Sequence, residues 1–306
     1  MTQISLSDTA FEGVGLIVRK PLAVLTWAAV IFVAMAIPIT LLFGTLAPAF
    51  MDLMRHSMDG SQPSPEDMMK FQLRWMAANG PIMLCSLVAR AVLMSAVFRA
   101  VLRPEDSRFA YLRLGKAELL TGLVYLCIMI MMFMIMFAGM IVLVGLTVAS
   151  AIASKAAAVG VAVVLVVALI GLLFWVILRL ILALPMTFAE GQFRMFEAWQ
   201  LSRGHVLQLF FIGLVAFATV MVIEMVVGGV IGLTAIGVIA SHTRDAGGAA
   251  NIFQRPPSEW LAPLAPWLVL GGAIFALFGA VIVAIMYAPL AAAYRALIPT
   301  ESKATA

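Results

Sequence analysis

Six apolar runs dominate this sequence, and each is long enough to cross the hydrocarbon core of a bilayer, which takes about 20 residues in a helix. The runs cover residues 22–50, 81–102, 119–149, 157–184, 206–240 and 265–297. Hydrophobic residues make up 64% of the chain and charged residues 11%, whereas soluble domains are near 45–50% and 25%. The sequence therefore predicts an all-α, polytopic membrane protein. It forms one integral domain, residues 1–306, with six transmembrane helices.

The segment between the fourth and fifth runs has the character of an elbow. Pro185 interrupts the apolar run, and residues 190–205 mix apolar with polar side chains before the next run begins. This pattern is typical of a helix that lies in the headgroup layer between two spans. Similar segments predict helices over residues 109–118 and 10–20. We therefore expect three interfacial elbow helices.

The distribution of lysine and arginine predicts the orientation of the chain. One set of connections and termini carries 12 of the 19 basic residues, the other carries 6, and Arg90 lies within a span. By the positive-inside rule, both termini and all three elbows are cytoplasmic. Residues 51–79 then form a periplasmic helical loop, in which Ser64 and Pro65 are suited to start a helix over 65–78. A weak threefold repeat of elbow and two spans indicates either duplication or the usual composition of a cytoplasmic boundary.

Two ionisable residues lie deep within predicted spans. Arg90 is about nine residues, or roughly 13 Å of helix, from either end of its span, which is too far for easy contact with water. Glu224 is also deep, and charged groups at such depth usually face a partner inside the bundle. We therefore expect an Arg90–Glu224 pair. It would be a structural ion pair, the polar lining of a substrate or lipid path, or the site of a proton-coupled step at Glu224.

A second group of basic residues lies at the predicted cytoplasmic boundary, where lysine and arginine contact lipid headgroups. The expected headgroup-facing residues are Arg99, Arg103, Arg108, Arg113, Arg179, Arg194, Arg203 and His205. For Arg179, we favour a snorkelling anchor over a ligand contact. We also expect two acidic residues to pair at this level, Glu190 with Arg194, and Glu118 with Lys116 or Arg113.

No pattern in the sequence predicts catalysis, a cofactor or a metal centre. The three histidines fall in different segments, and no nucleophile elbow, phosphate loop or zinc spacing is present. Met51, Met54 and Met58 share a helical face near His56, a set that suits copper(I), although methionine also fills apolar surfaces. We favour packing, and expect no metal. The two cysteines lie inside apolar runs, so we expect no disulfide, and no basic block indicates nucleic-acid binding.

The third elbow resembles a segment of a known group of bacterial proteins. The stretch begins at Arg179, passes Pro185 and Glu190, and ends with AWQLSRG at residues 198–204. It resembles six-span inner-membrane proteins typified by the membrane domain of some glycerophosphodiester phosphodiesterases, and related stand-alone proteins. RPED at 103–106 with YLRLG at 111–115 is similar to a stretch in the stand-alone members. The resemblance implies a membrane module of the bacterial inner membrane. The hydrolase activity of that group belongs to a separate soluble domain with clustered acids and histidines, which has no counterpart here.

These observations give three hypotheses for function. The first is a non-enzymatic membrane protein that handles lipid or another amphipathic molecule, or supports envelope maintenance. The second is a transporter of small solutes or peptides that uses Arg90 and Glu224. The third is an accessory or scaffold subunit of a membrane complex. The expected partners are membrane lipids, with other membrane proteins or a second copy of the chain as alternatives.

Overall fold

The computed structural model describes residues 6–58, 60–62, 64–245 and 257–298, and its regular elements are all helical. The helices are α1 (Leu6–Ala10), α2 (Glu12–Arg19), α3 (Pro21–Met58), α4 (Pro65–Leu102), the 3-10 turn η1 (Arg108–Tyr111), α5 (Lys116–Ala151), α6 (Lys155–Leu180), α7 (Ala183–Glu190), α8 (Glu197–Leu201), α9 (Val206–Asp245) and α11 (Pro257–Leu297). Within the described residues, five helical segments are long and apolar enough to cross a membrane. A sixth candidate is the pair α2–α3, which is bent by 97°. The all-α fold with five or six such helices agrees with the prediction.

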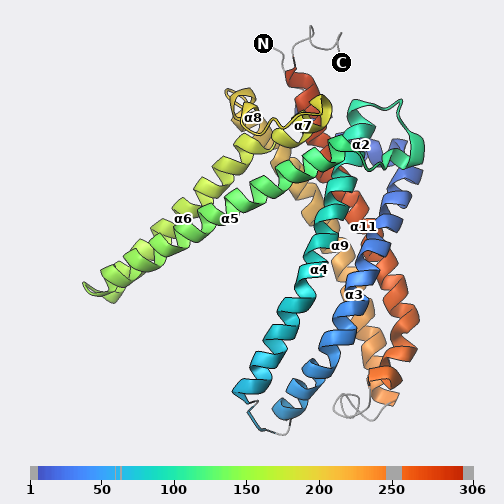
Figure 1. Cartoon of the computed structure of the whole chain (residues 1–306), viewed down its shortest axis with the longest axis vertical. Helices are drawn as coiled ribbons and strands as arrows, with labels where there is room; N and C mark the ends of the chain where they lie inside the picture. Colours follow the sequence, from blue (N-terminus) through green and yellow to red (C-terminus); the bar gives the residue numbers. More distant parts are fainter. Residues whose placement is uncertain (1–5, 59, 63, 246–256, 299–306) are drawn as a thin grey trace.

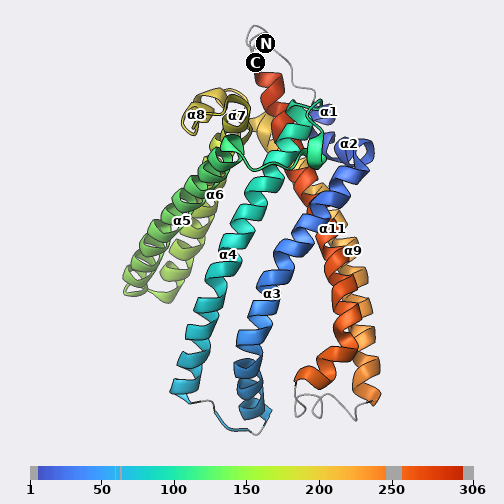
Figure 2. The ribbon, with the colours of Figure 1, turned by 45° about the vertical axis from the view of Figure 1, so that its right-hand side comes forward.

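The long helices form three pairs, α3–α4, α5–α6 and α9–α11, which converge at one end of the molecule (Figures 1 and 2). We call this end the junction, and it comprises α2, residues 103–115, α7 and α8. Helices α3, α4 and α11 pack against one another, and α9 packs on α11. The α5–α6 pair leaves the junction in a different direction from the other helices (Figure 1).

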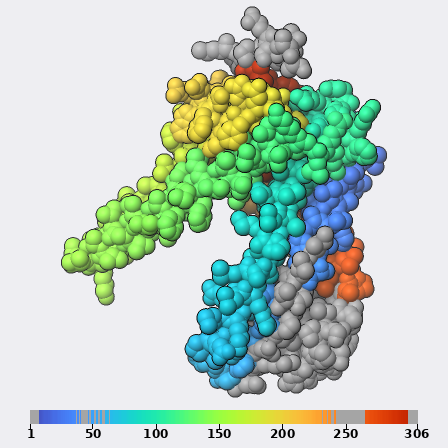
Figure 3. All heavy atoms as spheres, in the orientation of Figure 1, coloured from blue at the N-terminus to red at the C-terminus, as the bar shows by residue number. Residues whose placement is uncertain are grey.

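The α5–α6 hairpin is attached to the rest of the protein at its base. The buried residues of α5 are Glu118, Thr121, Val124 and Ile128, and all four lie in its first four turns. Beyond them α5 packs mainly on α6, and the remaining apolar side chains of the hairpin are largely exposed. A space-filling view shows the hairpin standing apart from the lower part of α4 (Figure 3). In a bilayer, this exposed apolar surface would face lipid.

The segment at residues 51–79 consists largely of continuations of its neighbouring helices. Helix α3 extends to Met58, and α4 begins at Pro65 and continues to Leu102. Ser64 caps α4 as predicted, because its Oγ accepts a hydrogen bond from the backbone N–H of Asp67 at 3.2 Å. The predicted helix over 65–78 therefore joins the predicted span over 81–102. Pro81 lies inside α4, where it removes one backbone donor without ending the helix.

The prediction of a helix over residues 109–118 is wrong. Phe109, Ala110 and Tyr111 have φ angles of 52°, 55° and 67°, in the left-handed region, and α5 starts only at Lys116. Donors from distant residues form hydrogen bonds to the carbonyl oxygens of this segment, in place of the backbone N–H groups of a helix. The Trp27 indole donates to the Ala110 carbonyl oxygen at 2.8 Å, and Arg99 Nη1 donates to the Tyr111 carbonyl oxygen at 2.6 Å. Tertiary hydrogen bonds thus override the amphipathic pattern.

The other two elbows are helical but broken. The first consists of α1 and α2, and α2 meets α3 at the 97° bend. In the third, Pro185 lies within the first turn of α7, where a missing backbone N–H costs little. Helix α7 ends at Gly191, which has a φ of 63° that suits glycine, so residues 190–205 do not form one helix.

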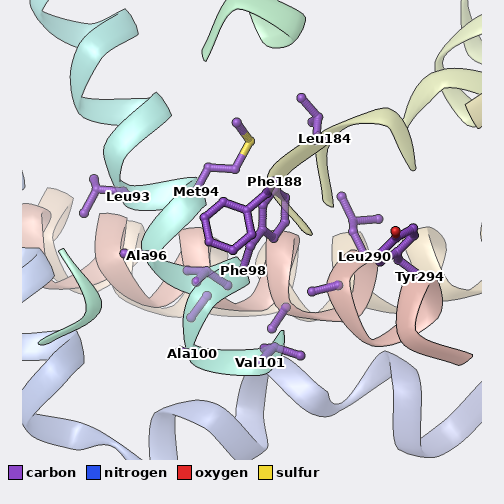
Figure 4. Packing of buried hydrophobic residues seen from close by; sticks show 14 of the residues in the cluster. Leu93, Met94, Ala96, Phe98, Ala100, Val101, Leu184, Phe188, Leu290 and Tyr294 are labelled. Atoms are coloured by element: carbon purple, nitrogen blue, oxygen red, sulfur yellow. The ribbon is translucent and has the colours of Figure 1, made fainter. Parts of the chain in front are cut away.

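The core lies next to the junction and depends on small residues of α11. Phe98 of α4 packs against Phe188 of α7, with ring centroids 6.0 Å apart (Figure 4). Buried alanines on α11, including Ala284, allow neighbouring helices to approach closely. A Cβ atom at Gly13 would lie 2.5 Å from the Cα atom of Ile285, so α2 packs directly against the α11 backbone. This contact fixes the direction of α2 relative to α3.

Candidate functional site

A groove between α4 and α5 is the main candidate site, and it has a volume of about 500 Å³. It is lined by Met83, Ser86, Leu87 and Arg90 of α4 and by Tyr125, Leu126, Met129, Ile130 and Phe133 of α5. On each helix these residues recur at intervals of three or four, so each helix contributes one face. The lining is apolar except for one cation and two hydroxyl groups. Such a surface fits the chain of an amphipathic molecule.

Arg90 supplies the charge in this groove. Its Nη1 donates to the Tyr125 hydroxyl oxygen at 3.4 Å, a long contact with a neutral group. Among the described residues Arg90 forms no ion pair, and the structure does not bring it together with Glu224, which is exposed on α9. The reason is geometric, because the Arg90 face of α4 turns toward α5, whereas α9 packs on α11. The deep cation is therefore available to an anionic group that enters the groove.

Arg99 was expected to face headgroups, but the structure buries it in the junction. Its side chain is 6% exposed and forms an ion pair with Glu118, which is 5% exposed. Arg99 Nε also lies 3.6 Å from Asp106 Oδ2, and the guanidinium lies 5.3 Å from the ring centroid of Phe188. The predicted pairing of Glu118 with Lys116 or Arg113 is therefore replaced by Arg99. The buried charge of Arg99 is therefore compensated by several neighbouring groups, as a buried charge requires.

Two further arginines of the junction are held by protein groups. Arg113 forms an ion pair with Asp106, so this carboxylate joins Arg99 and Arg113. Arg103 Nη2 donates to the Ala189 carbonyl oxygen at 2.9 Å and thereby connects the end of α4 to α7. Both arginines remain partly exposed, so contact with headgroups is compatible with these bonds.

Arg194 pairs with Glu190, as the sequence predicts, at 2.9 Å, and also with Glu197 at 3.1 Å. The hydrogen bond that Arg194 donates to Glu197 and the charge of Glu190 raise the pKa of the Arg194 guanidinium above its usual value. The Tyr294 hydroxyl donates to Glu190 Oε1 at 3.2 Å, which connects α7 to the end of α11. Arg194 therefore contributes to the internal structure of the third elbow.

Arg179 lies beside two tryptophans at the end of α6, whose ring centroids are 5.0 Å apart. Its guanidinium carbon is 5.7 Å from the ring centroid of Trp175 and 5.6 Å from that of Trp199. Its Nε and Nη1 atoms are buried and have no hydrogen-bond partner in the described part of the chain. The aromatic rings compensate the charge electrostatically. This arrangement connects α6 to α8.

The remaining predicted headgroup residues lie near the surface. Arg108 and Arg203 are exposed at the junction. His205 is half-buried, and its Nδ1 lies 2.8 Å from Gln208 Oε1, so the ring already has a protein partner. Four of the eight predicted residues are thus exposed, and two of these four, Arg103 and Arg113, also bind protein groups.

No group of three or more His, Cys, Asp or Glu residues that could hold a metal ion occurs within the described ranges. The side chains of Met51, Met54 and Met58, on which the copper alternative rests, lie outside the described part of the protein. Cys85 and Cys127 are both free thiols.

Several residues that build the site were not singled out from the sequence. Tyr125 faces Arg90, Trp27 holds the Ala110 carbonyl, and Asp106 joins two arginines. Tyrosine and tryptophan in apolar spans were a usable signal, since their polar atoms need partners when buried.

Comparisons of this chain with protein-family models, with curated proteins and with solved structures found no match.

Proposed function

We propose that this protein is a non-enzymatic, multi-pass protein of the bacterial inner membrane that binds an anionic amphipathic molecule in the α4–α5 groove. The observation that carries the proposal is Arg90, an exposed cation in a largely apolar groove, whose one hydrogen-bond partner among the described residues is a neutral hydroxyl. Arginine matches phosphate and carboxylate groups with two parallel hydrogen bonds. A lipid with an anionic headgroup, or a related amphiphile, satisfies both the charge and the apolar walls.

The proposed orientation has the junction on the cytoplasmic side. It is supported by the excess of Lys and Arg among the residues of the junction and termini. In this orientation, α2 and α7–α8 lie in the inner headgroup layer, and the α5–α6 turn reaches the opposite side. The resemblance of the third elbow to bacterial inner-membrane modules supports the same assignment. The transporter hypothesis loses support, because its Arg90–Glu224 pair does not form.

The test uses full-length protein purified in mild detergent and native mass spectrometry of the lipids that it retains. Arg90→Gln removes the charge, and a hydrogen bond to a charged group contributes about 1.5–3 kcal/mol, so retention of anionic lipid should fall at least tenfold. The matched control is Arg74→Gln, an exposed arginine of α4 outside the groove, which should retain lipid like the wild type. Equal retention by Arg90→Gln and wild type would refute the groove as the binding site.

The non-enzymatic part of the proposal has its own measurement. The purified protein is incubated with glycerophosphodiesters in the presence of Mg²⁺, Ca²⁺ or Zn²⁺. We expect no release of glycerol phosphate above the rate of the buffer. Metal-dependent release that copurifies with the protein would contradict this part, while leaving lipid retention by the groove a separate result.

A further inference from the structure

The first elbow lies beside two pockets that share one wall. The elbow pocket, with a volume of about 350 Å³, includes Arg19, Lys20, Thr26 and Ser107 among its lining residues. The α3–α4 pocket, with a volume of about 710 Å³, includes Val30, Ala34, Cys85, Val88 and Leu114, and its one charged lining residue, Arg113, forms an ion pair with Asp106. Residues 107–114 contribute to both pockets, which are therefore neighbours.

One face of α3 runs past both pockets. Leu22 and Thr26 line the elbow pocket, and Val30 and Ala34 line the α3–α4 pocket. These residues are four apart, so they form a single row along the helix. From Pro21 to Ala34 the helix rises about 20 Å, which is close to the thickness of one leaflet with its headgroups, about 20–22 Å. The two pockets therefore span the dimensions of one lipid molecule.

The charge of the elbow pocket favours an anion. The Glu12 carboxylate is occupied by Arg19, whose Nη2 lies 2.6 Å from Glu12 Oε1. Lys20 has no carboxylate partner among the described residues, and its Nζ lies 6.0 Å from the ring centroid of Tyr111. Three ionised groups therefore leave one net positive charge beside the hydroxyl of Ser107.

Exposed apolar residues line both pockets, Phe109 and Leu114 in the α3–α4 pocket and Leu22 in the elbow pocket. Phe109 and Leu114 are each 83% exposed, and Leu22 is 76% exposed. Large apolar side chains around a cation are characteristic of a protein surface that inserts into the acyl region below the headgroups. The occupant therefore reaches the site from the bilayer.

We infer that the elbow pocket and the α3–α4 pocket together hold one anionic glycerophospholipid of the cytoplasmic leaflet. Its phosphate lies at Lys20 and Ser107, and an acyl chain lies along Val30 and Ala34. Lipid tails are as apolar as the pocket wall, so the wall does not distinguish one lipid from another by polarity. The charge at Lys20 selects an anionic headgroup, and the wall fits the shape of the acyl chain. The inference goes beyond the proposed function, since this site shares no lining residue with the α4–α5 groove.

The test is photocrosslinking of the full-length protein in nanodiscs of phosphatidylcholine that contain a little phosphatidylglycerol with a diazirine in its acyl chain. Adducts on residues 26–36 and 109–114, mapped by mass spectrometry, report the new site. Adducts on residues 125–133 report the α4–α5 groove in the same sample, so either site can fail alone. We expect adducts at the new site with this probe, and at least fivefold fewer with diazirine phosphatidylcholine.

Two variants with matched controls probe the two ends of the site. Lys20→Gln should lower the adduct yield about fivefold, as expected for one lysine near an anionic headgroup. The control Lys155→Gln, in the distant α5–α6 hairpin, should leave it unchanged. Ala34→Phe should lower the yield about tenfold by overfilling the pocket, whereas Val33→Phe, on the exposed side of α3, should not. Circular dichroism verifies the fold of Ala34→Phe, and the Lys20→Gln result decides the assignment if that variant does not fold.

Three outcomes would overturn the inference. The first is an equal yield with the phosphatidylcholine probe, which means that the charge does not discriminate. The second is an equal loss in Lys20→Gln and Lys155→Gln, which means that only the overall charge matters. The third is complete competition by soluble glycerol phosphate, which would reassign the elbow pocket to a free phosphate compound.

Discussion

The buried ion pair between Arg99 and Glu118 can be tested by removing one of its charges. Glu118→Gln keeps the size of the side chain and an acceptor oxygen but leaves Arg99 without its closest carboxylate. Breaking a buried pair by removing one partner costs about 3–5 kcal/mol. Asp106 remains 3.6 Å from Arg99 Nε and compensates part of the charge, so the expected loss of unfolding free energy is about 3 kcal/mol.

The assay is unfolding of the full-length protein in mixed micelles by increasing amounts of sodium dodecyl sulfate, followed by circular dichroism. Arg99→Met should cost about 4 kcal/mol, because the Tyr111 carbonyl also loses its donor. The double variant Arg99→Met/Glu118→Gln removes both charges of the pair, so its loss of stability should be smaller than the sum of the two single losses. The cycle should give a coupling energy of at least about 2 kcal/mol.

The Arg19–Glu12 pair provides a matched control, because it joins the same residue types with Arg19 59% exposed and Glu12 20% exposed. Glu12→Gln should cost less than about 1 kcal/mol. High salt should weaken the Arg19–Glu12 contribution and leave the Arg99–Glu118 contribution nearly unchanged. A loss below about 1 kcal/mol in Glu118→Gln, or additive effects in the cycle, would refute the account of a buried and coupled pair.

Two further substitutions test how the second and the first elbow are fixed. Trp27→Phe leaves the Ala110 carbonyl without its indole donor and should lower the unfolding free energy by about 2–3 kcal/mol, with faster amide hydrogen exchange over residues 107–115. Gly13→Ala places a Cβ atom 2.5 Å from the Ile285 Cα atom and should cost about 1–3 kcal/mol in the same unfolding assay. Gly15→Ala, two residues along the same helix, should be neutral or slightly stabilising, because its Cβ atom meets only a flexible arginine end.

Controls and opposing results differ for the two substitutions. Trp267 is 49% exposed, so Trp267→Phe should cost little and show that loss of a tryptophan alone is tolerated. If exchange at residues 107–115 is the same in Trp27→Phe and wild type, the indole does not hold this loop. If Gly13→Ala is as stable as Gly15→Ala, α2 does not pack directly on the α11 backbone.

Long apolar helices could be predicted from the sequence because hydropathy over about 20 residues is a local property. The same holds for the Ser64 cap and the Glu190–Arg194 pair, whose members are three and four residues apart. The left-handed turn at residues 109–111 could not be predicted in this way. Its carbonyl at Ala110 is bound by Trp27, which is 83 residues away in the chain.

Whether a predicted arginine is buried or exposed also depends on packing between distant segments. Arg99 and Arg108 both lie at the same predicted boundary, so both were expected to face lipid headgroups. The structure buries Arg99 against Glu118 and leaves Arg108 exposed. Arg90 could be singled out because its depth within a predicted span is a local property of the sequence. The helix that faces Arg90 could not be predicted from the sequence. The choice between Glu224 and Tyr125 depends on which face of α4 meets α5.

The attachment of the α5–α6 hairpin only at its base makes it a lever. Helix α5 has 36 residues, so at about 1.5 Å per residue it is about 54 Å long. A rotation of about 5° about the pivot at Glu118 displaces the distant tip by roughly 4 Å and Phe133 by about 2 Å. A small adjustment of one ion pair at the pivot therefore changes the width of the α4–α5 groove next to Phe133.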